Sequence, residues 1–326
     1  MKKGKLKIGV LFGGKSAEHE VSIISAKNII KALDKEKYQI FPVKIDKNGK
    51  FNLNTLKKID VIFPVLHGPF GEDGSMQGLL KILNLPFVGS SVLGSAVSMD
   101  KEIMKKLFKE AGIPIGKFIV LKYGEKITFE KVKKELGMPV FVKPVNMGSS
   151  VGISKVKNKK EYDTAIKEAF KFDLKVIIEE NIAGREIECS VLGNNNPIAS
   201  LPGEIIANQE FYSYDAKYIS QESVAEIPAK LPRATIKKIQ ELAVKTFKIL
   251  NCEGMGRVDF FVKKNAKGHT DVIVNEINTI PGFTNISMYP KLWEASGLPT
   301  GKLLDKLIAL AIERFKRESK LKTTVK

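Results

Sequence analysis

The chain has 326 residues, of which 43% are hydrophobic and 28% are charged, and this length accommodates two or three domains with sizeable cores. No apolar run approaches the roughly 20 residues of a membrane helix, and the basic N-terminus lacks a small-residue cleavage site, so we expect a cytoplasmic protein without a membrane partner. The net charge of +18 would suit nucleic acid, but the lysines are scattered and not interleaved with aromatic residues, so we expect no nucleic acid to bind.

The first part of the chain alternates strand and helix patterns. A strand pattern leads into Gly13-Gly14 and then into a helix pattern whose apolar stripe includes Ile23, Ile30 and Leu33. This βαβ order predicts a parallel sheet. The expected strands cover 6–12, 39–45 and 60–66, and the expected helices cover 16–33 and 74–83.

Two further segments follow, the first from Met99 to about residue 186 and the second from about 187 to the end. In the first, short strands and helices alternate around a glycine- and serine-rich loop, which predicts an α+β unit. Its strands are expected at 118–121, 139–143, 151–156 and 176–180, and its helices at 99–110, 128–136 and 159–170. The last segment should hold helices at 233–250 and 301–317.

A hairpin pattern in the last segment carries charged residues in apolar surroundings. Two strand patterns flank the polar loop KKNAKGHT. Alternation along a strand places Glu276 and Asn278 on one face, and likewise Arg257 and Asp259. Mg²⁺ takes one or two protein carboxylates and completes its shell with phosphate oxygens and water, so these oxygen ligands suit it. A surface hairpin with solvated acids is the alternative, but the flanking residues are apolar enough to predict burial.

The run Gly9–Ser16 matches the P-loop pattern G-x-x-x-x-G-K-[ST]. In a true P-loop the variable residues wrap phosphate, whereas Val10, Leu11 and Phe12 belong to the expected strand. We therefore regard the match as accidental. A P-loop kinase remains an alternative, and it would depend on Lys15 for ATP binding.

Polar residues also stand where strands end and helices begin. Glu18 lies in the expected first turn of a helix at the carboxyl end of the sheet, where ligands of open α/β sheets bind; stabilisation of the helix dipole is the alternative. His67 directly follows a strand and is a candidate substrate contact. The neighbouring Glu72 and Asp73 are explained by the start of the next helix.

Several residues of the middle segment suit a phosphate-bearing ligand. Lys143 lies in an apolar strand, which is unfavourable unless it meets an anion, and Lys101 opens a helix whose dipole opposes its charge. The loop 146–152 is rich in small residues with free N–H groups that can fold over phosphates. Carboxylates that follow the next strand can accept from an adenine amino group or from ribose hydroxyls. These are Glu179, Glu180 and Glu186.

Two loops of the last segment complete the candidate site. Phe211–Tyr218 gathers aromatic residues with polar tips, which is more typical of a lid or a binding site than of a core. Pro281–Thr284 and Ser287 follow Asn278 directly, so their N–H groups and hydroxyls should lie beside the expected metal ligands.

Together these blocks resemble the D-alanine–D-alanine ligases of the ATP-grasp superfamily. The resemblance covers nearly the whole chain, in the order GGKSAEHEVS, HGPFGEDGSMQG, MDK, VKPVNMGSSVG, IEENIAGRE, FYSYDAKY, GRVDFF and NEINTIPGFTNIS. It implies an α/β (α+β) fold of three-domain ATP-grasp architecture. The implied domains are an N-terminal parallel-sheet α/β substrate domain (1–98), a central ATP-grasp subdomain (99–186) and a C-terminal ATP-grasp domain with metal and substrate sites (187–326).

The resemblance also implies ATP and two Mg²⁺, which Mn²⁺ can replace, as cofactors. For ATP it implies Lys101 and Lys143 at the phosphates, Lys217 at the γ-phosphate, Glu179 and Ile182 at adenine and Glu186 at ribose, with Ser150, Glu180 and Asn275 completing the set. For the metal it implies Asp259, Glu276 and Asn278.

The implied substrate is D-alanine, at two subsites. The implied residues are Glu18 for the first ammonium, Ser149 and Tyr218 linked to Glu18 to hold the lid loop shut, Arg257 and the N–H of Gly282 for the oxyanion, Ser287 and the Met288 backbone for the second carboxylate, and His67 as a further substrate contact and candidate base.

The implied reaction is ATP-dependent ligation of two D-alanines through a D-alanyl phosphate, for peptidoglycan precursor synthesis. Some similar ligases prefer D-lactate as the second substrate; Tyr218 is the dipeptide-type residue and favours D-alanine. A D-alanine–D-lactate-type ligase, or another ATP-grasp ligase that joins a carboxylate to an amine, is the alternative. Asn181 departs from the pattern, since an aromatic residue often stands there, and this puts the stacking on adenine in doubt. Family members are commonly homodimers, so we expect a homodimer here.

Overall fold

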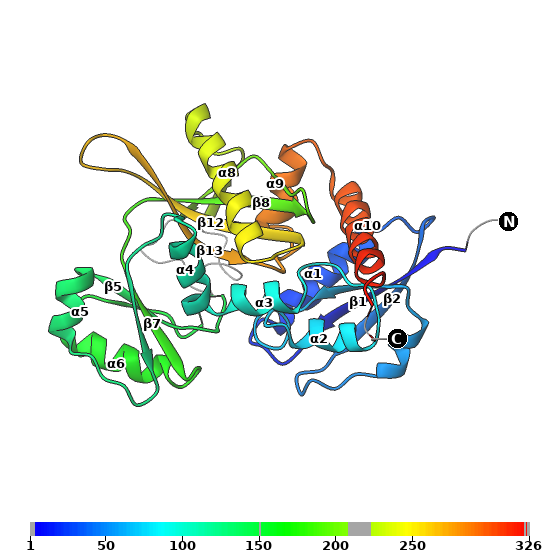
Figure 1. The fold of residues 1–326 in the computed structure, drawn as a ribbon, viewed down its shortest axis with the longest axis horizontal. Helices are drawn as coiled ribbons and strands as arrows, with labels where there is room; N and C mark the ends of the chain where they lie inside the picture. Colours follow the sequence, from blue (N-terminus) through cyan, green and yellow to red (C-terminus); the bar gives the residue numbers. More distant parts are fainter. Residues whose placement is uncertain (1–3, 150, 208–222, 323, 325–326) are drawn as a thin grey trace.

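A computed structural model describes residues 4–149, 151–207, 223–322 and 324. Within this part of the chain, helices flank three β-sheets (Figure 1). The N-terminal sheet lies at one end of the longest axis and a small antiparallel sheet lies at the other, with a larger antiparallel sheet above and between them. The mixed α/β and α+β organisation expected from the sequence is thereby confirmed.

The N-terminal sheet is parallel, with strand order β2-β1-β3, as its βαβ pattern predicts. Its strands are β1 (Leu6–Gly13), β2 (Tyr38–Ile45) and β3 (Val61–Val65). The helices of this part are α1 (His19–Ala32), the 3₁₀ helix η1 (Leu53–Lys58), α2 (Ser75–Ile82) and α3 (Val92–Met99). All five residues of β3 are buried, which explains its uninterrupted apolar sequence.

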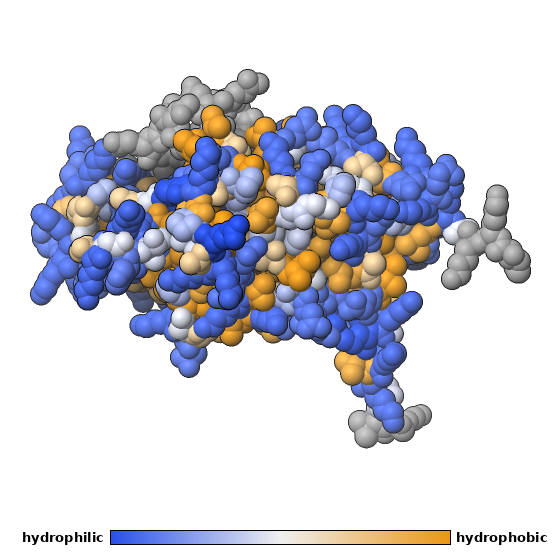
Figure 2. Space-filling view, turned by 90° about the horizontal axis from the view of Figure 1, so that it is seen from above, coloured by the Kyte–Doolittle hydropathy of each residue, from blue (hydrophilic) through white to orange (hydrophobic). Residues whose placement is uncertain are grey.

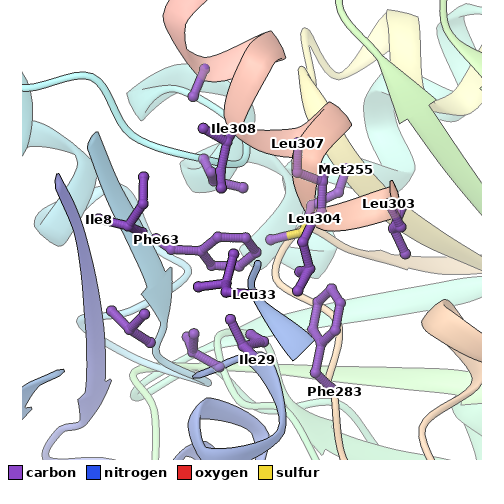
Figure 3. Close-up of a cluster of buried hydrophobic side chains, with 14 of the residues drawn as sticks. Ile8, Ile29, Leu33, Phe63, Met255, Phe283, Leu303, Leu304, Leu307 and Ile308 are labelled. Carbon is purple, nitrogen blue, oxygen red and sulfur yellow. The ribbon is translucent and has the colours of Figure 1, made fainter. Parts of the chain in front are cut away.

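The last helix of the chain, α10 (Thr300–Glu318), packs against this N-terminal sheet. Leu304 and Leu307 of α10 meet Ile8 and Phe63 of the sheet in one buried cluster (Figure 3). Phe283, from the loop that follows the C-terminal hairpin, joins the same cluster and packs edge-on against Phe63 with ring centroids 6.1 Å apart. Burial of these apolar side chains fixes that loop against the N-terminal sheet.

The small sheet is antiparallel, with strand order β4-β7-β5-β6. Two helices pack their apolar stripes on it through Val132, Leu136, Tyr162 and Ala165. The strands are β4 (Phe118–Lys122), β5 (Val140–Pro144), β6 (Ser154–Val156) and β7 (Lys175–Glu180), and the helices are α5 (Phe129–Leu136) and α6 (Lys159–Ala169).

The large sheet follows the order β11-β10-β8-β12-β13, with β9 paired to β8. Met104 and Phe108 of helix α4 pack into its core together with Phe247 and Phe260. The strands are β8 (Arg185–Gly193), β9 (Ile198–Ala199), β10 (Gly203–Ala207), β11 (Ser223–Glu226), β12 (Gly254–Lys264) and β13 (Thr270–Asn278), and the helices are α4 (Lys101–Glu110), α8 (Arg233–Ile249) and α9 (Met288–Ala295).

Three helix expectations need correction. Helix α1 begins at His19 and not near Ser16, because Gly13 and Gly14 both take positive φ and the Ser16 hydroxyl accepts the N–H of Glu18 in a turn. The helices α3 and α9, of eight residues each, were not expected from the sequence. The division at residues 98 and 186 stays a proposal, with α4 packing on the large sheet and α10 on the N-terminal one.

Hydrophilic side chains spread over the whole face seen in Figure 2, with smaller hydrophobic areas among them. No helix within the described ranges is both long enough and apolar enough to cross a membrane.

Candidate active site

A cavity of about 370 Å³ lies between the small sheet and the hairpin β12–β13 of the large sheet. Helix α4 and the loop after β5 also line it. Most of the residues that were expected to bind ATP therefore come together here. They are Lys101, Lys143, Glu179, Glu180, Ile182, Glu186 and Asn275, with Ser149 and the candidate metal ligand Glu276 beside them.

Lys101 begins α4 directly after Asp100, whose side chain caps the helix by accepting the N–H of Ile103. The Lys101 ammonium donates to the carbonyl oxygen of Met147 at 2.7 Å and lies 3.8 Å from Glu276 Oε2. One buried cation thus contacts the glycine-rich loop on one side and the hairpin on the other. Phosphates that enter between them would meet this charge.

Lys143 reaches the cavity from β5, where its ammonium lies 2.7 Å from Glu179 Oε2. Burial would lower the pKa of Lys143, but the carboxylates of Glu179 and Glu276 outweigh burial and raise it. The Glu179 carboxylate was expected to face adenine. Both of its oxygens contact lysines, since Oε2 faces Lys143 and Oε1 lies 2.7 Å from the ammonium of Lys105. Its contact with adenine stays a prediction.

Lys105 was missed by the sequence reasoning. It is buried in α4 together with Lys101, Met104 and Phe108. These positions recur with the period of a helix, so the available signal was a lysine inside an otherwise buried stripe. Such a lysine is unfavourable unless a carboxylate meets it, and Glu179 does.

The hairpin brings its polar residues onto one face, as the alternation predicts. Arg257 pairs with Asn278, and Asp259 pairs with Glu276, across β12 and β13. The Arg257 guanidinium donates two hydrogen bonds to Asp259, from Nε to Oδ1 at 2.7 Å and from Nη2 to Oδ2 at 2.8 Å. Its Nε also lies 3.0 Å from Glu188 Oε2 of β8. Glu188, which lies opposite Asp259, was not singled out from the sequence.

This face fits a magnesium ion bound jointly with phosphate. Asp259 and Glu276 supply carboxylates and Asn278 supplies an amide oxygen, which matches the one or two carboxylates that Mg²⁺ takes from proteins. Asp259 Oδ2 now accepts from Asn278 Nδ2 at 3.0 Å. Across the part of the chain that the structure describes, no three His, Cys, Asp or Glu side chains group into a metal site.

On the other side of the loop after β5 lies Glu18, at the N-cap of α1. The Ser149 hydroxyl donates to its carboxylate, and Ser149 itself has a φ of 49°. The contact between these two residues is the one that the resemblance implies, while its function stays a prediction. Ser150, Lys217 and Tyr218, with the rest of the loop 208–222, lie outside the described residues.

The loop after β3 holds the loop after β13 by its backbone. His67 Nδ1 lies 3.0 Å from the carbonyl oxygen of Ile280, and the N–H of Ile280 donates to Glu72 at 3.3 Å. Burial lowers the pKa of His67, against the nearby charge of Glu18. Burial also raises the pKa of Glu72 to about 8, and Glu18 adds to this shift. The sequence explained Glu72 only by the start of the next helix, but the structure places its carboxylate in the site as well.

The segment after Ile280 carries the remaining candidate residues. A Cβ added to Gly282 would lie 2.8 Å from Ser287 Oγ, so the backbone of Gly282 approaches this hydroxyl closely. The same Oγ accepts the N–H of Thr284 at 2.9 Å. Met288 begins α9, whose first N–H groups are unsatisfied within the helix and suit a carboxylate.

The P-loop alternative does not fit the structure. Gly9 lies inside β1, paired with both β2 and β3. A Cβ on Gly9 would approach Ile59 Cδ1 to 2.5 Å, so this glycine serves close packing in the sheet. Lys15 lies over the ring of Phe70, 4.9 Å from its centroid.

Three sheets with a lysine-lined cavity between two of them, beside a carboxylate-bearing hairpin, define an ATP-grasp enzyme. Two family descriptions match the sequence: "D-ala D-ala ligase N-terminus" over residues 7–58 and 51–90, and "D-ala D-ala ligase C-terminus" over residues 107–309. The chain belongs to the D-alanine–D-alanine ligase family.

Individual relatives agree with this assignment over nearly their whole length. The D-alanine–D-alanine ligase of Oceanobacillus iheyensis is 48% identical, covering 98% of this chain and 99% of that protein. The solved D-alanine–D-alanine ligase of Coxiella burnetii superposes with a TM-score of 0.86 at 41% identity, covering 97% and 96% of the two chains. The Bacillus anthracis ligase complexed with ATP superposes with a TM-score of 0.82 at 34% identity, covering 96% and 99%.

Proposed function

We propose that this chain joins two D-alanine molecules into D-alanyl-D-alanine for peptidoglycan precursor synthesis, consuming ATP and releasing ADP and phosphate. The observation that carries this proposal is the position of the loop after β5. Its Met147 carbonyl meets Lys101 on the nucleotide side, and its Ser149 hydroxyl meets Glu18 on the N-terminal side. The carboxylate of Glu18, which would bind the ammonium of an amino acid, is thereby brought next to a cavity suited to ATP.

The nucleotide is held chiefly by charge. Lys101 and Lys143 would face the phosphates, Ile182 and the segment after β7 would contact adenine, and Glu186 would take the ribose. Asp259, Glu276 and Asn278 would hold the two magnesium ions, which neutralise phosphate charge when bound. Phosphoryl transfer needs little covalent chemistry from the protein, so these residues act by position and electrostatics.

The first D-alanine would bind with its ammonium on Glu18, and its carboxylate would attack the γ-phosphorus of ATP. This gives D-alanyl phosphate and ADP. Arg257 and the N–H of Gly282 would stabilise the oxyanion that forms when the second amine attacks the acyl carbon and phosphate leaves. Ser149, hydrogen-bonded to Glu18, would keep the loop closed. Closure matters because water that entered the site would hydrolyse the acyl phosphate.

The second D-alanine would place its carboxylate at Ser287 and at the N-terminus of α9. Its ammonium must lose a proton before attack. His67 suits this role because Nδ1 is engaged by the Ile280 carbonyl, while Nε2 is buried with no hydrogen-bond partner among the described residues. With its pKa lowered by burial, the ring is neutral and can accept a proton.

The test is product formation by the purified protein with Mg-ATP and D-alanine, L-alanine, or D-alanine plus D-lactate. D-alanine-dependent release of ADP together with the mass of D-alanyl-D-alanine is the expected result. A D-alanyl-D-lactate product would keep the mechanism and change the second substrate. Absence of ADP release with every substrate would contradict the proposed activity.

Three further proposals accompany the activity: a homodimer, a cytoplasmic location and the division into domains at residues 98 and 186. The homodimer rests on membership of the family and is tested by sedimentation equilibrium at several protein concentrations. A mass equal to one chain at every concentration would refute it.

A further inference from the structure

Helix α4 sends two lysines to the wall of the cavity, four residues apart. Lys101 is 8% exposed, and Lys105 is only 3% exposed. Met104 and Phe108 flank Lys105 on the buried face of the helix. An ammonium in such surroundings is retained only where an opposite charge and hydrogen-bond acceptors meet it.

Lys105 has such partners on two different sheets. Its Nζ lies 2.7 Å from Glu179 Oε1 at the end of β7, and it donates to the carbonyl oxygen of Asn275 in β13 at 3.3 Å. A single ammonium therefore ties α4 to both sheets that enclose the cavity. With these acceptors around it, Lys105 has a defined place that does not depend on a nucleotide.

Glu179 stands between two lysines. Its second oxygen, Oε2, lies 2.7 Å from Lys143 Nζ. The side chains of Lys105, Glu179 and Lys143 are 4%, 9% and 15% exposed, so water screens their charges weakly. Within this trio, two positive charges and one negative charge leave a net charge of plus one. Without Lys105, Glu179 and Lys143 would form a neutral pair.

We propose that Lys105 is a positioning residue of the nucleotide site, which neutralises Glu179 so that the charge of Lys143 acts on the phosphates of ATP. Lys105 need not touch the nucleotide itself. The inference rests on the proposed use of ATP and adds a residue to it.

The test compares a ligand with phosphates and one without. Equilibrium binding of Mg-ATP and of adenosine is measured for the wild type and for Lys105→Met, whose side chain has a similar length and no charge. We expect Mg-ATP to bind about tenfold more weakly to the variant, because the phosphates lose a nearby net charge. Adenosine binding should stay within about twofold. Lys109→Met, on the exposed face of the same helix, is the matched control.

A second variant should change the ratio of the Mg-ATP affinity to the adenosine affinity in the opposite direction. Glu179→Gln removes the one carboxylate that contacts both lysines, so the affinity for Mg-ATP relative to adenosine should rise. Taking the ratio cancels any adenine contact that the substitution removes from both ligands. The double variant, Lys105→Met with Glu179→Gln, restores one net positive charge and should return the ratio to near the wild-type value.

Equal weakening of Mg-ATP and adenosine in Lys105→Met would show that Lys105 only supports the fold, and would overturn the inference. If circular dichroism shows that Lys105→Met does not fold, Glu179→Gln decides, and an unchanged ratio there overturns it. A wild-type protein that binds neither ligand would refute the proposed use of ATP and the inference together. Wild-type binding with unchanged ratios would refute the inference alone.

Discussion

The hydroxyl of Ser149 donates a hydrogen bond to the carboxylate of Glu18, although 131 positions separate the two residues in the sequence. Glu18 stands at the N-cap position of α1 in the N-terminal part, and Ser149 belongs to the loop that lines the candidate nucleotide cavity. The contact therefore joins the candidate site for the first ammonium to the loop that we expect to cover the phosphates of ATP. Because Glu18 takes part in both, closure of the loop and binding at the substrate site should depend on each other.

Ser149→Ala should uncouple ATP consumption from dipeptide formation. Without the hydroxyl, the loop loses its anchor on Glu18, and water can reach the acyl phosphate. We expect dipeptide formation to fall about tenfold, as loss of one positioned contact does, while ADP release falls less. Parallel assays of ADP and D-alanyl-D-alanine give the ratio directly. Ser319→Ala, at the exposed end of α10, is the control, and a ratio of one ADP per dipeptide in Ser149→Ala would refute the link.

Glu276→Gln should stop ATP turnover without unfolding the protein. The substitution removes a charged candidate ligand that faces Asp259 across the hairpin. We expect kcat to fall at least about 100-fold, because phosphoryl transfer depends on neutralised phosphate charge. The thermal midpoint should stay within about 3 °C, since Glu276 is partly exposed.

The matched control is Glu241→Gln on α8, whose side chain is 66% exposed and which lies outside the cavity. Magnesium titrations of both variants report the apparent metal requirement. Retained turnover in Glu276→Gln at the wild-type magnesium concentration would remove Glu276 from the metal site.

Glu72 should make the stability of the protein fall as the pH rises. Burial raises its pKa from an ordinary value of 4.5 to about 8. Between these values the folded protein keeps a proton that the unfolded chain releases, so the free energy of unfolding decreases with increasing pH. Glu72→Gln cannot ionise, and its stability curve should lack this decrease. Between pH 5 and pH 9 the difference in the free energy of unfolding between the two proteins should change by roughly 4 kcal/mol. Urea unfolding at pH 5, 7 and 9 measures it, and parallel curves would refute the prediction.

The polar face of the hairpin could be predicted from the sequence because it depends on local rules. Alternation along β12 and β13 places Arg257 with Asp259 and Glu276 with Asn278, and the observed register brings these pairs opposite each other. The parallel N-terminal sheet followed from βαβ order in the same way.

The contacts of Glu179 could not be predicted, because they depend on how α4 packs against two separate sheets. The sequence shows an acid after a strand, and both Lys105 and Lys143 are distant in the chain. Likewise, nothing local indicates that Glu72 turns inward to accept the N–H of Ile280, 208 positions away. The preference of helix N-termini for acidic residues was a sufficient explanation of Glu72, so nothing in the sequence pointed to its contact with Ile280.

His67→Gln should impair the second half of the reaction more than the first. His67 is only 5% exposed, and its ring is oriented by the Ile280 carbonyl. Its Nε2 has no hydrogen-bond partner among the described residues and can accept the proton of the incoming amine. Gln can keep a hydrogen bond to that carbonyl but cannot act as a base at neutral pH. We expect dipeptide formation to fall about 100-fold, within the range for loss of a general base.

Formation of the acyl phosphate should fall much less in His67→Gln, because that step needs no deprotonated amine. Exchange of ¹⁸O between the bridging and non-bridging positions of labelled ATP, measured with D-alanine present, reports this step by itself. A second sign is the pH profile: the low-pH limb of dipeptide formation should disappear in the variant, since burial holds the pKa of His67 below its usual range and the neutral ring is the active form. If exchange and ligation decline in equal proportion, His67 acts in binding the first substrate, and another group removes the proton.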